Sequence, residues 1–389
     1  LNKMRKVLCA AGLIGLVAFS LSHLTNHDYL WSGMRETWFR GWENPQIDDF
    51  EFREYVRRIP ASSNPQPWPK GSRWGRVELS AEAESWHVEH QSASFLVIHD
   101  DSLVLETYYR GHDATTLTNS FSMAKSITAM AAGLAVGRGL VDEQALLSTY
   151  IPRFAEGSGT NLKVQEVLQM RSGITFGESY KNPFGFQAKA YFRENNRDLL
   201  MTYRPSNEPG TLFDYQGGNT MLIAEMLDVV REGNLASDIA DNLWGQMGAE
   251  HDAFWGLDGD PESGAVERAI AQFYATTRDY ARFGQMILDT GAWKGKQLLD
   301  KAYATRMITP QNQLNSDVDA DFYGYQIWLG RTDDGRAFSM MEGLRGQMII
   351  SVPSLRLVVV RTGYYKSQKN KRQLPVECYD VIEMARALL

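Results

Sequence analysis

The alternation of apolar and polar positions changes character twice along this 389-residue chain. Residues 95–98 and 103–109 are apolar or β-branched runs on either side of a polar His-Asp-Asp-Ser turn, a pattern typical of an antiparallel hairpin. From Ser122 to about Val136 the chain is rich in Ala, Met, Ile and Leu and contains no proline, and Gly139 follows. This stretch predicts a buried helix.

Residues 140–300 are mostly helical in pattern, and strand-like runs return only afterwards. The clearest helical stretches are 164–170, 219–230 and 277–288, the later strand-like runs are 323–329, 347–352 and 355–361, and a closing amphipathic helix covers 376–389. Strands at both ends of a domain with helices between them predict an α+β fold. We therefore expect one antiparallel sheet flanked by terminal helices, beside an all-helical lobe.

The first 24 residues carry a compartment signal. Lys3, Arg5 and Lys6 precede an uncharged apolar run over 7–21, which is the order of charge and hydrophobicity found in an export signal. Cleavage as a signal peptide and retention as an inner-membrane anchor are both open, because the run is about long enough to span a bilayer. Retention is favoured, and we expect a periplasmic or other extracytoplasmic protein without lipidation at Cys9.

A lead-in segment over residues 25–79 precedes the predicted domain at 80–389. Residues 43–75 are polar and rich in proline, so we expect an extended stretch rather than a packed element. Aromatic residues ahead of them suit a membrane interface, although they could equally cover the catalytic domain. These aromatic residues are Trp31, Trp38, Phe39 and Trp42.

The composition of the chain excludes several kinds of function and of site. The formal net charge is −7 and the pI is near 5.6, so the chain lacks the clustered basic charge of nucleic-acid-binding proteins. Cys9 and Cys378 are the two cysteines, and Cys9 lies in the apolar leader. A disulfide framework or a cysteine metal site is therefore excluded.

Ser122 and Lys125 form the one Ser-x-x-Lys sequence of the chain, at the start of a predicted helix. Residues three apart share a helix face, so the amine can reach the hydroxyl. A buried lysine can lose its proton near neutral pH and accept the proton of serine, and the amides at the helix start favour developing negative charge. Alone, the tetrapeptide could also be an ordinary helix start with a solvated lysine.

Tyr215 follows in a glycine-rich stretch just before an apolar helix. A phenol held near a lysine can exist partly as phenolate and relay a proton between a serine and a leaving group. A buried tyrosine bonded to backbone would give the same local sequence. Together, the Ser-x-x-Lys tetrapeptide and the tyrosine favour the catalytic interpretation.

These motifs, in this order, resemble the β-lactamase-related serine hydrolases, and the similarity runs from about residue 80 to the C-terminus. The stretches that carry it are Ser122-x-x-Lys125, Pro209-Gly210-Thr211 to Tyr215-x-x-Gly218-Asn219, Gly343-Leu344-Arg345-Gly346-Gln347, Met170 to Ile174, Asp279 to Gln285 and Tyr323 to Trp328. The branch that it resembles contains class C β-lactamases, carboxylesterases and 6-aminohexanoate-dimer hydrolases.

The resemblance implies a β-lactamase/penicillin-binding-protein-like fold and an acyl-enzyme on Ser122, with Lys125 and Tyr215 sharing proton transfer. It also implies that one oxyanion amide comes from an edge strand, which we place at Gly346 or Gln347. Tyr180 is matched to a substrate-binding tyrosine of the oligoamide-hydrolysing members.

The chain departs from the family at the edge strand. The Lys-Thr/Ser-Gly triplet of β-lactamases is missing, and Gly343-Leu344-Arg345-Gly346 stands in its place. This loss argues against strong recognition of a β-lactam carboxylate. Arg345 is a candidate ligand for a substrate carboxylate, but it could also point to solvent or pair with Glu342.

We therefore predict a serine hydrolase that needs no metal or other cofactor and cleaves a small-molecule ester or amide. A penicillin-binding peptidase or weak β-lactamase is the alternative within the fold, and a non-catalytic membrane-associated binding protein is the alternative of another class. The oligomeric state is open.

Overall fold

The computed structural model describes residues 15, 17, 19–310 and 322–389. Its largest sheet has six strands in the order β3-β2-β12-β11-β10-β9, and every neighbouring pair is antiparallel. Their bounds are β2 (Ser92–His99), β3 (Ser102–Tyr108), β9 (Trp328–Arg331), β10 (Ala337–Gly343), β11 (Gln347–Val352) and β12 (Leu357–Gly363). The predicted hairpin is thus joined to the C-terminal strands through the β2 and β12 pair.

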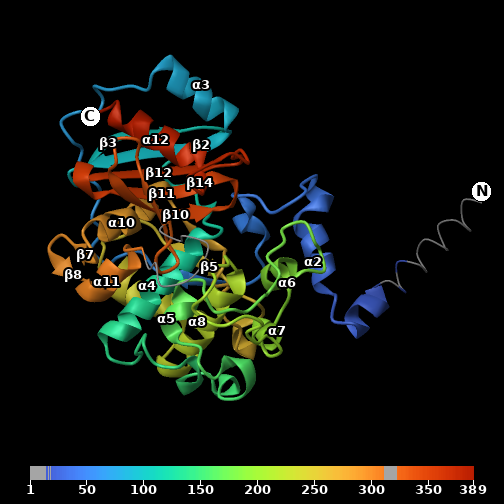
Figure 1. The fold of residues 1–389 in the computed structure, drawn as a ribbon. Coiled ribbons are helices and arrows are strands. Elements are labelled where there is room, and N and C mark those ends of the chain that lie inside the picture. The colour runs from blue at the N-terminus through green and yellow to red at the C-terminus, as the bar shows by residue number, and fades with distance from the viewer. Residues whose placement is uncertain (1–14, 16, 18, 311–321) are drawn as a thin grey trace, which may run out of the picture.

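Helices cover both faces of this sheet. The terminal helices α3 (Ala81–Glu89) and α12 (Val376–Arg386) lie on one face, and α10 (Thr277–Leu288) lies on the other (Figure 1). The side chains of β12 alternate accordingly, with Val358 and Val360 in the core on the α10 side and Val359 in the core on the α12 side. The predicted antiparallel sheet flanked by terminal helices is confirmed.

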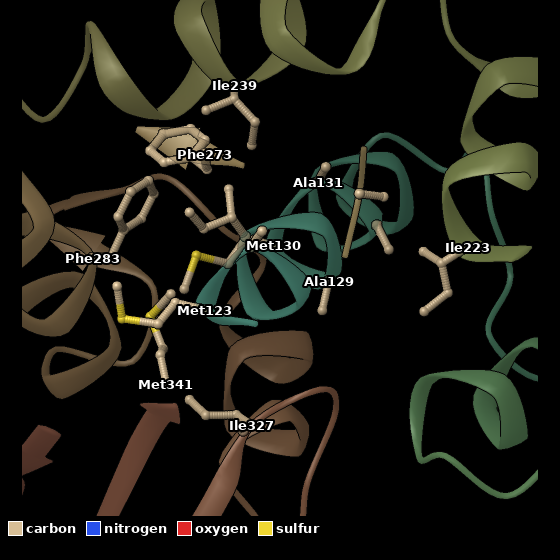
Figure 2. Close-up of a cluster of buried hydrophobic side chains, with 14 of the residues drawn as sticks. Met123, Ala129, Met130, Ala131, Ile223, Ile239, Phe273, Phe283, Ile327 and Met341 are labelled. Carbon is tan, nitrogen blue, oxygen red and sulfur yellow. The ribbon is translucent and has the colours of Figure 1, made fainter. Parts of the chain in front are cut away.

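The second lobe is built around α4 (Met123–Gly137), which the sequence predicted. Its residues from Met123 to Ala135 are buried, and Figure 2 shows Phe273 and Phe283 on one side of the helix and Ile223 on the opposite side. Burial on all sides explains why this helix is apolar all round. The lobe's other helices are α5 (Val164–Leu168), α6 (Phe186–Phe192), α7 (Asn196–Leu200), α8 (Gly217–Val230), α9 (Leu235–Ile239) and α11 (Lys301–Met307).

The lobe is not all-helical, which corrects the expectation. A second sheet has the order β1-β5-β6-β4, and a two-stranded sheet joins β7 to β8, whereas β13 and β14 pair beside the large sheet (Figure 1). The bounds are β1 (Val56–Ile59), β4 (Thr118–Asn119), β5 (Ala253–Gly256), β6 (Phe273–Ala275), β7 (Ala292–Trp293), β8 (Lys296–Gln297), β13 (Asn370–Lys371) and β14 (Leu374–Pro375). Strands of two to four residues are too short to show alternation in the sequence.

The predicted strand over 323–329 is also corrected, because β9 begins only at Trp328. Gln326, with a φ of 53°, turns away from strand geometry. Its side chain donates to the carbonyl oxygens of Val167 and Leu168 and accepts from the hydroxyl of Thr220. This turn therefore joins the helices of the second lobe instead of extending the sheet.

Residues 43–75 are not simply extended, which corrects the expectation, because they contain the short helix η2 (Asp49–Phe52) and β1. Ahead of them, the lead-in forms α2 (Tyr29–Glu36), which lies beside α6 (Figure 1), and the short helix η1 (Trp38–Arg40). β1 pairs with β5 along four residues. Prolines and polar residues suggested an isolated segment, but its partners come from the far half of the domain.

Most of the predicted leader at 1–24 lies outside the described residues. In the part of the chain that the structure describes, no helix is both long and apolar enough to cross a membrane. Trp38 and Phe39 are exposed, at 67% and 73%. Export and membrane attachment stay predictions.

Candidate active site

Ser122 lies on a sharp turn at the start of α4, where it is the N-cap residue and is half-buried. The preceding Phe121 has a φ of 44°, a left-handed conformation that is costly for a residue with a side chain. Two bonds hold the turn: the Phe121 N–H donates to Asn119 Oδ1 at 2.9 Å, and the Ser120 N–H donates to the Phe273 carbonyl at 2.8 Å. Among the described residues, the Ser122 N–H has no acceptor.

Lys125 is in direct contact with the serine. Its Nζ donates to Ser122 Oγ at 2.7 Å, and the carbonyl oxygen of Ile270 lies at 3.5 Å. The residue is only 2% exposed, and burial lowers the pKa of Lys125 to about 8, although the negative charges of Glu178 and Glu342 act in the opposite direction. An amine that loses its proton near pH 8 is suited to accept the serine proton.

Tyr215 completes the group of three predicted catalytic residues. Lys125 Nζ lies 5.1 Å from the centre of its ring, and the nearby Ser122 hydroxyl acts to lower the pKa of its phenol. Burial raises the pKa of Tyr215 well above its usual value, and the charge of Glu178 raises it further. The resting side chain is therefore a neutral phenol, not the partial phenolate expected from the sequence.

The phenol of Tyr215 is held in place by aromatic neighbours. Its ring stacks on Trp328 at 5.2 Å and meets Tyr323 edge-on at 6.1 Å. Behind it, the Asp214 N–H donates to the Met170 carbonyl at 2.9 Å. The sequence singled out Tyr323 and Trp328 only as part of a family pattern, and no local feature marked them as supports of the catalytic tyrosine.

Glu178 was missed as a site residue, yet it organises the loop that carries Tyr180. The Tyr180 hydroxyl donates to Glu178 Oε1 at 2.6 Å, and the Gly217 N–H donates to Oε2 at 2.8 Å. Tyr180 is half exposed, and the pKa of its hydroxyl is raised by burial and then by Glu178. This loop and the start of α8 are therefore held together beside the catalytic residues.

The end of β10 touches the serine turn. A Cβ added to Gly343 would lie 2.3 Å from the Ser120 carbonyl oxygen and 3.3 Å from the Phe121 Cβ. The next residue, Leu344, packs in a small apolar cluster with Phe121. Its N–H has no acceptor within the described part of the chain. Two free amides, at Ser122 and Leu344, thus belong to backbone segments in contact.

The neighbouring predicted residues have other contacts. The Gly346 carbonyl accepts from Arg361 Nη1 at 2.9 Å, and the Gln347 side chain donates to the carbonyls of Leu344, at 3.0 Å, and Gly363, at 2.6 Å. These bonds fix the turn between β10 and β11 against β12. A role of either residue's own amide in oxyanion binding stays a prediction.

Arg345 is bonded to the protein itself. Its Nε donates to the Pro45 carbonyl at 3.0 Å and its Nη1 to the Tyr364 carbonyl at 2.9 Å, while Glu342 pairs with Lys366. The sequence had suggested that Arg345 could instead face solvent or pair with Glu342. Because its guanidinium donates to two backbone carbonyls, the structure gives less support to the interpretation that it binds a substrate carboxylate. These bonds tie the edge turn to the lead-in segment.

The close approach of Gly343 leads to a prediction. Gly343→Ala should lower kcat by roughly tenfold, because a methyl group would push the end of β10 away from the serine turn. Gly343 has a φ of −126°, so backbone strain does not contribute. Steady-state kinetics on a chromogenic ester would measure the effect. Gly259→Ala, whose Cβ would meet its nearest neighbour at 3.8 Å, is the control. Equal kinetics for both variants would contradict the prediction.

Comparison with known proteins shows which chains this one is similar to. A curated relative, the 6-aminohexanoate-dimer hydrolase of Paenarthrobacter ureafaciens, is 21% identical over 314 residues, covering 76% of this chain and 78% of the relative. A solved structure from Bacillus anthracis, assigned provisionally as a 6-aminohexanoate-dimer hydrolase, has a TM-score of 0.73 at 20% identity and covers 88% of this chain and 93% of its own.

A family VIII carboxylesterase structure has a TM-score of 0.63 at 17% identity, covering 83% of this chain and 99% of its own. At such identities the structural likeness establishes the fold, which is that of β-lactamases and penicillin-binding proteins. The Beta-lactamase family model matches residues 81–365, which is well over half of the chain. The chain therefore belongs to the Beta-lactamase family.

Proposed function

We propose that the protein is a serine hydrolase that cleaves an ester or amide bond through an acyl-enzyme on Ser122. The observation that carries the proposal is the 2.7 Å contact between Lys125 Nζ and Ser122 Oγ, made by a lysine whose pKa burial lowers to about 8. A solvated lysine would keep its proton at that pH and could not act as a base.

In the acylation step, neutral Lys125 accepts the hydroxyl proton as Ser122 Oγ attacks the substrate carbonyl carbon. The resulting oxyanion collapses, and the leaving alcohol or amine takes the phenolic proton of Tyr215. The Lys125 ammonium then returns a proton to the Tyr215 oxygen, which restores both side chains. In deacylation, water attacks the ester carbonyl and gives a proton to Lys125. Lys125 returns this proton to Ser122 Oγ as that oxygen leaves, which releases the acid and restores the free serine and the neutral lysine.

The oxyanion is assigned to the amides of Ser122 and Leu344. Both N–H groups lack an acceptor in the described residues, and the contact of Gly343 with Ser120 brings their backbone segments together. The second amide is thus proposed two residues earlier than the Gly346 suggested by the sequence. Gly346 and Gln347 are also bonded to residues of β12: the Gly346 carbonyl accepts from Arg361, and the Gln347 side chain donates to the Gly363 carbonyl. This attachment to β12 supports the choice of Leu344.

An esterase or amidase is favoured over a β-lactamase or penicillin-binding peptidase. On β10, the positions before Gly343 carry Met341, which is buried, and Glu342, which is paired with Lys366. No lysine of β10 is therefore available to bind a β-lactam carboxylate. The 6-aminohexanoate-dimer hydrolase relative and the carboxylesterase structure support the same choice. A non-catalytic role is disfavoured because the three side chains are assembled and in contact.

Covalent labelling with an active-site probe and a comparison of turnover rates between substrate classes would test the proposal. A fluorophosphonate should add one mass increment to the intact protein, on the tryptic peptide that contains Ser122. Ester or short amide substrates should turn over much faster than a chromogenic cephalosporin. Faster cephalosporin turnover would favour the β-lactamase alternative. An unmodified protein that hydrolyses nothing would favour a binding function.

A further inference from the structure

Asp49 is a buried carboxylate in the lead-in segment, before the residues that the family model matches. It is 0% exposed, and both of its oxygens are used. Oδ1 accepts from Tyr274 Oη at 2.8 Å and from Asn119 Nδ2 at 3.1 Å, while Oδ2 accepts from Tyr191 Oη at 3.3 Å and pairs with Arg53. Burying a carboxylate is costly unless it is paired and bonded in this way.

Asn119 links this carboxylate to the catalytic turn. Its Oδ1 accepts the Phe121 N–H at 2.9 Å, next to Ser122, while its Nδ2 donates to Asp49. Its own N–H donates to the Ile47 carbonyl at 2.6 Å. Asp49 therefore fixes the orientation of the side-chain amide that holds Phe121 at its φ of 44°.

The same stretch of the lead-in also reaches the second proposed oxyanion amide. Ile47 is fully buried in the cluster that contains Phe121 and against which Leu344 packs. One residue along from Leu344, the Arg345 guanidinium donates to the Pro45 carbonyl. Residues 45–49 thus contact both backbone segments that carry a free amide.

Arg53 pairs with the Asp49 carboxylate. Its side chain is 5% exposed and lies between Asp49 and Glu36 of α2, with Nη1 at 2.6 Å from the Glu36 carboxylate. The negative charges of Asp49 and Glu36 raise the pKa of Arg53 against the cost of burial. Because Arg53 stays a cation, Asp49 has a fixed partner on the side away from Asn119.

We infer that Asp49 is a positioning residue of the oxyanion hole, and that residues 45–53 of the lead-in hold the two oxyanion amides in place. Asp49 touches neither substrate nor reacting atoms. It acts through Asn119 on the Ser122 amide, while Ile47 and Pro45 support the Leu344 side. The inference rests on the proposed function, because an oxyanion hole has a role only if Ser122 is acylated.

The test is Asp49→Asn in the full-length protein, with Asp252→Asn as a matched control. Both aspartates tie the lead-in to the body, since Asp252 accepts from Arg58 Nε at 2.6 Å and from the Ala61 N–H at 2.8 Å. Within the described residues, neither of these bonds of Asp252 involves the serine turn. Asp49→Asn should lower kcat for an ester by about tenfold with KM nearly unchanged, because the amide contacts tighten in the transition state. The rate of fluorophosphonate labelling should fall in parallel.

Asp252→Asn should keep kcat and lose less melting temperature than Asp49→Asn, because its ion pair with Arg58 is the more exposed of the two. Unchanged kcat and labelling rate in Asp49→Asn would overturn the inference alone. If Asp49→Asn does not fold, Tyr191→Phe tests the inference instead. It removes only the hydroxyl that accepts from Asn119 Nδ2 at 3.0 Å and donates to Asp49 Oδ2 at 3.3 Å. It should lower kcat a few-fold, and an unchanged kcat would overturn the inference. Failure of the probe to label wild-type Ser122 would instead reject the proposed function and, with it, this role.

Discussion

Ser122→Ala should reduce kcat by at least about 10⁴-fold and abolish fluorophosphonate labelling, while the melting temperature hardly changes. The loss is large because no other group can take the place of the nucleophile. The fold should tolerate the change, since Ser122 is the N-cap residue of α4 but its hydroxyl makes no capping bond. Ester kinetics, intact mass and thermal unfolding would measure the three quantities.

Ser80→Ala is the matched control for that experiment. Ser80 is also an N-cap residue, but its Oγ accepts from the Ala83 N–H at 3.1 Å and so caps α3. Its loss should cost about 1 kcal/mol of stability and leave kcat unchanged. The two variants thus predict opposite patterns. Full residual activity in Ser122→Ala would reject the serine as nucleophile.

Lys125→Ala and Tyr215→Phe should each lower kcat by roughly a hundredfold or more, and the double variant should lose far less than the product of the two. Lys125 Nζ donates to the Ser122 hydroxyl and lies 5.1 Å from the centre of the Tyr215 ring, so the proposed mechanism gives the two side chains one proton path. Tyr203→Phe, at a half-buried tyrosine that packs against Phe176 and Phe186, is the control. Strictly multiplicative losses would contradict a shared path.

The pH dependence of the wild-type enzyme follows from the same lysine. Lys125 acts as a base only when neutral, and burial lowers its pKa to about 8. The rate of ester cleavage should therefore rise as the pH increases through about 8 and level off above it. A profile that is flat across this range would exclude Lys125 as the base.

The catalytic residues could be predicted because each has a local signature. Ser122 and Lys125 lie one helical turn apart, so their spacing alone predicts the contact seen at 2.7 Å. The closing helix and the strands β2, β3, β11 and β12 were predictable for a similar reason, since their apolar positions form clear runs. The edge turn after Gly343 was located correctly, although the preceding β10 had not been recognised as a strand.

The supports of the site could not be predicted, because they join residues far apart in the chain. Glu178 meets the start of α8 at Gly217, and Asp49 meets Asn119, with nothing in either local sequence to indicate the partner. The proline-rich composition of the lead-in suggested an extended stretch, whereas buried ion pairs and β1 fix it to the body. Tertiary contacts of this kind outweigh local propensity.

The pairing of β2 with β12 has a consequence for the order of events during synthesis. Ser94 of β2 lies opposite Thr362 of β12, and Gly343 of β10, two strands further along the sheet, reaches the turn before Ser122. A chain that leaves the ribosome N-terminus first can pair β2 with β3 at once, but the pairing of β2 with β12 forms late because it is distant in sequence. In the proposed mechanism, Ser122 is synthesised long before its second oxyanion amide, which Leu344 supplies at the end of β10. The proposed chemistry therefore has to wait for the C-terminal strands.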